Sequence, residues 1–115
     1  MKRIVVDDGD AEVVELSKED YTKAIEELIT RRRRQVLIHS IIYYRMNENI
    51  VSDDTWAAWA LELEDLQNKY PEIADRCPYA EGFKNFDHST GMNLPLDDSW
   101  AIGKATQLLG WRNAR

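Results

Sequence analysis

Cysteine, proline and long apolar runs are all scarce in this sequence, and each shortage excludes a class of protein. The one cysteine, Cys77, cannot build a disulfide framework or a cysteine-based zinc site within one chain, which suits a reducing compartment. No apolar run approaches the roughly 18 residues that cross a bilayer. Aspartates interrupt the N-terminal segment MKRIVVDDGD, unlike a cleavable signal peptide. We therefore expect a cytoplasmic protein that is neither secreted nor bound to a membrane.

The common catalytic motifs are also missing. The sequence has no Walker loop, no GxGxxG, no His-Glu-x-x-His and no set of zinc ligands. Asp87, His88 and Ser89 are the residue types of a catalytic triad, but neighbours in sequence cannot form the required line of nucleophile, base and orienting acid. We do not expect an autonomous enzyme. The segment FDHSTGMNLP is nevertheless rich in polar residues around Gly91, which can adopt positive φ, and Asp87, His88 and Thr90 are candidates for a loop site.

The charge of the chain is acidic and unevenly distributed. The net charge is -6, and without the four consecutive arginines at 31–34 it would be -10. Duplex DNA repels such a surface, so direct DNA binding is not expected, whereas a small molecule or a protein with a basic surface is a suitable partner. Successive helical residues point about 100° apart, so only one or two arginines can face one ligand. Arg31 and Arg34 are candidates for phosphate contact, and a solvated helix face is the alternative.

The length and pattern of the chain predict one mainly helical domain. A chain of 115 residues with 43% apolar residues is large enough for a single core. β-Branched residues on both sides of Asp8-Gly9 predict a short N-terminal β-hairpin. The expected organisation is a single domain over 1–115, with a β-hairpin at 1–16, a helical core at 17–70, an ordered loop at 71–97 and a C-terminal helix at 98–110.

Capping residues and apolar spacing predict three or four helices. Ser17 is placed to cap a helix that continues to about Met46, and the sequence leaves open whether Thr30 begins a second helix. Ser52 or Asp53 caps the next helix, which Pro71 ends. Gly110 is a suitable stop for the last helix. The centre of this α+β fold is predicted to be an antiparallel helical hairpin formed by 31–46 and 53–69.

Residues 39–73 contain a tyrosine pair, a polar turn, an Asp-started amphipathic helix and a closing Tyr-Pro-Glu. This order resembles the N-terminal helical nicotinamide-recognition module (domain Ia) of bacterial NAD-dependent DNA ligases, and small phage and prophage proteins described as ligase-related. The resemblance implies that Tyr43, Tyr44, Asp53 and Trp56 bind the ligand, with His39 adjacent.

The implied ligand is nicotinamide mononucleotide or NAD, because a cationic pyridinium ring stacks well on aromatic rings beside a carboxylate. Two positions depart from the family. Trp56 stands where the family has Tyr and keeps a flat aromatic surface. Ala57 stands where the family has Asp, and loss of such a charged hydrogen bond costs about 1.5 to 3 kcal/mol. Lys84 is not part of a Lys-x-Asp-Gly adenylation motif, so ligase chemistry is not implied. The alternative interpretation places the aromatic residues in the core of a helical hairpin.

Two hypotheses for function follow. The first is a non-catalytic, phage-type binding protein that uses the ligase-like hairpin to bind a nicotinamide-type nucleotide or a protein of the nucleic-acid machinery. The alternative is an acidic inhibitor of a nucleic-acid enzyme or host-defence effector, such as an anti-CRISPR-like inhibitor of Cas9. This inhibitor would act in the host cytoplasm through acidic residues including Glu62, Glu64 and Asp65.

Overall fold

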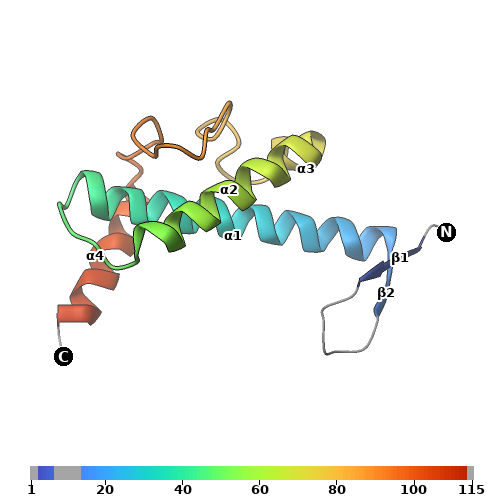
Figure 1. Cartoon of the computed structure of the whole chain (residues 1–115), viewed down its shortest axis with the longest axis horizontal. Coiled ribbons are helices and arrows are strands. Elements are labelled where there is room, and N and C mark those ends of the chain that lie inside the picture. The colour runs from blue at the N-terminus through green and yellow to red at the C-terminus, as the bar shows by residue number, and fades with distance from the viewer. Residues whose placement is uncertain (1–2, 7–13, 114–115) are drawn as a thin grey trace.

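The computed structural model describes residues 3–6 and 14–113, and it is mainly helical, as predicted. Figure 1 shows a long central helix with a small hairpin at one end and the other helices packed along the rest of its length. Within the described part of the chain, no helix has an apolar stretch long enough to cross a bilayer. The elements are β1 (Arg3–Val6), β2 (Val14–Ser17), α1 (Lys18–Tyr44), α2 (Asp53–Lys69), α3 (Pro71–Asp75) and α4 (Ser99–Asn113).

The two strands pair antiparallel, with Ile4 opposite Leu16. The predicted turn at Asp8-Gly9 lies outside the described residues. The strand pair leads directly into α1, because Ser17 ends β2 and its side chain accepts a hydrogen bond from the Asp20 backbone N–H at 3.1 Å. The cap predicted at Ser17 is therefore present.

Helix α1 is a single unbroken helix of 27 residues. Thr30 does not begin a second helix: its hydroxyl donates to the Glu26 carbonyl oxygen at 2.8 Å, as a threonine inside a helix does. Helix α2 runs back along α1 (Figure 1), so the predicted pairing of 31–46 with 53–69 is present. Because α1 contacts every other helix and both strands, it is the scaffold of the molecule.

The core lies where α2, α4 and the loop after α3 meet one face of α1. The side chains that α2 and α4 bury include alanines, which let the helix backbones approach α1 closely. The loop adds Phe83, which is 1% exposed. The buried apolar residues are Ile29, Val36, Leu37, Ile41, Ile42, Ala60, Leu63, Ala74, Cys77, Phe83, Leu94, Ala101 and Ala105.

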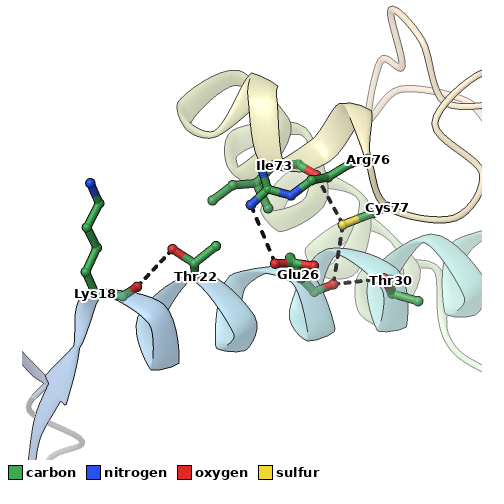
Figure 2. Close-up of polar contacts among 7 residues, drawn as sticks. All are labelled: Lys18, Thr22, Glu26, Thr30, Ile73, Arg76 and Cys77. Atoms are coloured by element: carbon green, nitrogen blue, oxygen red, sulfur yellow. Dashed lines mark hydrogen bonds and ion pairs between the residues drawn. The ribbon is translucent and has the colours of Figure 1, made fainter.

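The segment predicted as an ordered loop, 71–97, begins with a short helix that was not predicted. Pro71 follows the end of α2, as expected, but it also occupies the first turn of α3, where its fixed φ and missing N–H are tolerated. Figure 2 shows how the end of α3 is attached to α1: the Cys77 thiol donates to the Ile73 carbonyl oxygen at 3.2 Å and lies 3.7 Å from that of Glu26. Arg76 also forms an ion pair with Glu26 at 3.5 Å.

The predicted end of the last helix is wrong. Helix α4 continues past Gly110 to Asn113. The reason is tertiary, because Arg112 in its last turn donates to the Asn49 carbonyl oxygen at 3.1 Å and to the Glu48 carboxylate at 3.0 Å. At the other end, the Asp98 carboxylate accepts the Ala101 backbone N–H at 3.0 Å and caps the first turn of the helix.

Arg33 fastens α1 to both α2 and the loop. Its side chain is 2% exposed and donates to the Gln67 amide oxygen at 2.8 Å. It also donates to the carbonyl oxygens of Cys77 and Pro78 at 3.2 and 3.1 Å. Burial lowers the pKa of the Arg33 guanidinium. One member of the arginine run is therefore a structural residue of the interior.

We predict that replacing Arg33 by Met lowers the free energy of unfolding by about 3 kcal/mol, because buried acceptors lose a charged donor. The matched control is Arg31→Ala, since Arg31 is exposed and its ion-pair partner among the described residues is Glu27 on its own helix, at 2.6 Å. That substitution is expected to cost no more than about 0.5 kcal/mol. Urea denaturation of both variants measures the difference. Equal losses would contradict a structural role for Arg33.

Candidate functional site

A cleft opens where the end of α1, the start of α2 and the loop before α4 come together. Its volume is about 430 Å³, within the usual range of small-molecule sites. The five residues predicted from the 39–73 segment all line it, although they lie on two helices separated by a turn. His88 of the predicted loop site lines the same cleft. The lining includes His39, Tyr43, Tyr44, Asp53, Trp56 and His88.

The tyrosine pair stands at the surface of the cleft. Tyr43 is 57% exposed and Tyr44 is 45% exposed, because α1 ends at Tyr44 and leaves both rings beyond its packed part. Their ring centroids are 4.9 Å apart, with planes inclined by 39°. The Tyr44 hydroxyl lies 3.1 Å from the Thr90 hydroxyl oxygen, which ties the ring to the loop. The alternative interpretation, in which the aromatic residues form the core of the hairpin, is therefore wrong for these two tyrosines.

Trp56 is different, because it is partly buried and serves both the core and the cleft. Its indole N–H donates to the Ser40 hydroxyl oxygen at 3.2 Å and approaches the Val36 carbonyl oxygen at 3.4 Å. Ser40 is buried and donates in turn to the Val36 carbonyl oxygen at 2.6 Å. This arrangement holds the indole against α1 while part of the ring lines the cleft. The core interpretation of the aromatic residues therefore applies in part to Trp56.

Asp53 supplies the negative charge of the cleft. It is the first residue of α2, just after the cap Ser52, which accepts the Thr55 N–H at 3.1 Å. A carboxylate in the first turn is favourable for the helix, so its position needs no ligand to hold it. Ala57 also lines the cleft, one turn further along α2, but brings no charge. Among the described residues of the lining, Asp53 is the sole carboxylate.

His39 lies at the inner side of the cleft. Its ring is partly buried against Trp59, with centroids 5.4 Å apart. The Nδ1 atom is buried and has no hydrogen-bond partner in the described part of the chain. Burial lowers the pKa of His39 from its ordinary value of 6.5, because the charged ring would lose its hydration.

The loop reaches the cleft because Gly91 packs directly on α1. A Cβ atom at this position would lie 2.9 Å from Ser40 Cβ and 3.2 Å from Trp56 Cζ2, and closer still to the Ser40 hydroxyl. Gly91 does not use the positive φ that its residue type permits; the closeness of the backbone to Ser40 is what requires glycine. No sequence signal separates these two reasons.

The three predicted loop residues have different surroundings. His88 Nδ1 lies 2.8 Å from a Glu64 carboxylate oxygen, and the His88 backbone N–H donates to the other oxygen at 3.4 Å. Thr90 contacts Tyr44 and accepts the Met92 N–H at 3.1 Å. Asp87 accepts the Ser89 N–H at 2.7 Å, and this hydrogen bonding lowers the pKa of its carboxyl group. Glu64 and His88 are 24 residues apart, so no local sequence pattern connects them.

The arginines predicted to contact phosphate lie elsewhere. Arg31 and Arg34 border a second groove of about 480 Å³ beside Arg76, and neither lines the cleft. Arg31 pairs with Glu27, and the Arg34 guanidinium lies 5.1 Å from the centre of the Trp100 ring. The structure therefore does not bring these two residues to the aromatic site.

Curated DNA ligases of Thermotoga species are similar to this chain. Those of Thermotoga petrophila and Thermotoga maritima are each 28% identical to it over 93 residues, and that of Thermotoga neapolitana is 29% identical over 86 residues. The first two alignments cover 74% of this chain but 13% of each ligase, so the chain corresponds to a small segment of these proteins. The predicted resemblance to a ligase segment is thus confirmed. No family model and no solved structure matches the chain.

The contact between Gly91 and Ser40 predicts that Gly91→Ala lowers the free energy of unfolding by about 1 to 3 kcal/mol, because the added methyl group overlaps a buried side chain. Gly103→Ala is the matched control: Gly103 is on α4 with open space around it, and alanine there should stabilise the helix by up to about 1 kcal/mol. Urea denaturation measures both values. Stabilisation by Gly91→Ala would show that the loop is not held in this way.

The partly buried ring of His39 predicts a loss of stability on acidification. Its pKa in the folded chain lies below 6.5, so the stabilisation is fully present above about pH 6.5 and is lost as the pH falls toward the folded pKa. In that window the unfolded chain takes up the proton first. His39→Asn should remove this part of the pH dependence. Urea denaturation of both proteins at several pH values between about 5 and 8 tests the prediction, which is wrong if the two curves are parallel.

Proposed function

We propose that this chain is a non-catalytic binding protein whose cleft takes the nicotinamide ring of a mononucleotide or of NAD. One observation carries the proposal: the segment that resembles the ligase module surrounds a cleft with Tyr43, Tyr44, Trp56 and Asp53. Four residues chosen from a sequence pattern line a single cavity of suitable size. The similarity to a segment of DNA ligases supports the same interpretation.

The chemistry of the lining suits a flat cation. The exposed tyrosine rings offer apolar faces with negative π density, which attract a pyridinium ring. Asp53 adds a full negative charge that the fold places at the edge of the cleft. A neutral aromatic compound would gain the stacking but not the attraction to the carboxylate. The cleft should therefore prefer oxidised nicotinamide nucleotides over reduced ones.

Two of the three acidic residues suggested for the inhibitor alternative already form ion pairs within the chain. Of the acidic residues suggested for docking on a basic protein, Glu62 forms an ion pair with Arg32 at 3.2 Å. Glu64 is held by His88. Only Asp65 of that set has no ion-pair partner in the described part of the chain. The acidic-face inhibitor is therefore the weaker of the two functional hypotheses.

Titration calorimetry with nicotinamide mononucleotide tests the proposal. Asp53→Asn should weaken binding about tenfold, and Ala57→Asp should strengthen it about tenfold, since each changes one charged contact worth about 1.5 kcal/mol. The matched control is Asp54→Asn, because Asp54 is the exposed neighbour of Asp53 and does not line the cleft. Its affinity should equal that of the unmodified protein.

The gain expected from Ala57→Asp makes the experiment decisive. A weak natural affinity could escape detection, but a second carboxylate beside the first would bring it into range. Absence of heat at millimolar ligand for both the natural protein and the Ala57→Asp variant would overturn the proposal. Equal effects of Asp53→Asn and Asp54→Asn would show that general charge, and not the cleft, attracts the ligand.

A further inference from the structure

We propose that His88, oriented by Glu64, binds the phosphate group of the ligand, so that the cleft selects mononucleotides over nucleosides. This inference rests on the proposed function and extends it to the part of the ligand beyond the pyridine ring. Helices α1 and α2 contribute the aromatic rings and Asp53. The loop contributes His88 and Ser89, which come from outside the segment that resembles the ligase module.

Glu64 holds His88 at two points. One carboxylate oxygen lies 2.8 Å from Nδ1, and the other accepts the backbone N–H at 3.4 Å. The carboxylate belongs to α2 but does not line the cleft, whereas His88 does. With Nδ1 occupied by Glu64, Nε2 is the ring nitrogen left to meet a ligand. When a carboxylate holds one ring nitrogen of a histidine, the orientation of the ring and the direction of the other nitrogen are fixed.

The charges of the lining point to the same residue. The described lining contains no lysine and no arginine, so only a histidine can offer a cation to a phosphate there. His39 is disfavoured, because its Nδ1 is buried without a partner and a protonated ring would leave that N–H unsatisfied. His88 has no such difficulty: a protonated ring would donate Nδ1–H to Glu64 and Nε2–H to a phosphate oxygen. The second contact is a charge-assisted hydrogen bond.

Two other charged groups bear on this ring. An Asp87 carboxylate oxygen lies 4.0 Å from His88 Nδ1, on the loop itself, and Asp53 shares the cleft. In the described part of the chain, Glu64 and Asp87 are the ion-pair partners of His88. Both are negative, so they are compatible with a cationic ring between them and the ligand phosphate.

The test compares nicotinamide mononucleotide with nicotinamide riboside, which lacks the phosphate, by titration calorimetry on the whole chain. The natural protein should bind the mononucleotide about tenfold more tightly. His88→Gln should abolish this preference and leave the affinity for the riboside unchanged. The riboside affinity also reports that the variant is folded, which is expected because His88 is exposed.

A second pair of variants separates orientation from general charge. Glu64→Gln should reduce the preference for the mononucleotide, since the amide holds the ring less firmly. Glu62→Gln removes the same charge from the same helix, but Glu62 pairs with Arg32, so the preference should not change.

The outcomes are distinguishable from failure of the proposed function. If neither ligand gives heat, the proposed function fails and this inference fails with it. If both ligands bind with equal affinity, the proposed function stands and the role of His88 is overturned. A preference that survives His88→Gln also overturns it, because another group must then contact the phosphate.

Discussion

Two buried polar residues on one face of α1 hold this structure together. Arg33 and Ser40 are seven residues apart, about two helical turns, so both point the same way. Arg33 donates to α2 and to the loop after α3, and Ser40 accepts from Trp56 of α2 while Gly91 of the loop packs on it. Apolar burial alone is not directional. These contacts set where α2 and the loop lie along the long helix.

The cleft is a consequence of this arrangement. Its aromatic rings stand at the end of α1 because the helix stops there, and Asp53 stands at the start of α2 because acidic residues are stable in a first turn. The loop completes the lining because Gly91 has no side chain to separate it from Ser40. The site therefore needs few residues devoted to it alone. The chain, which matches 13% of the length of the similar ligases, lines such a cleft with its own residues.

Residue identity alone was a poor guide to the role of the charges. Four consecutive arginines look like a single basic patch, but the helix distributes them in different directions. Arg33 is interior, Arg32 pairs with Glu62 of α2, and Arg34 lies over the ring of Trp100. These three arginines are engaged in contacts within the chain and do not form a free basic patch. The net charge of -6 thus describes the composition more than any one surface.

Local signals in the sequence were sufficient for the main helices, and the resemblance to the ligase module supplied five residues of the cleft. Ser17 and Ser52 cap their helices through hydrogen bonds within the next turn. Tyr43 at the end of α1 and Trp56 at the start of α2 are separated by one turn of the chain. Tertiary structure alone decided the rest. Gly110 does not end α4 because Arg112 is held by Glu48, and His88 reaches the cleft because Glu64 and Gly91 hold the loop. Such contacts join residues that are distant in the chain. They form only when the folded backbone brings those residues together, which no local sequence pattern specifies.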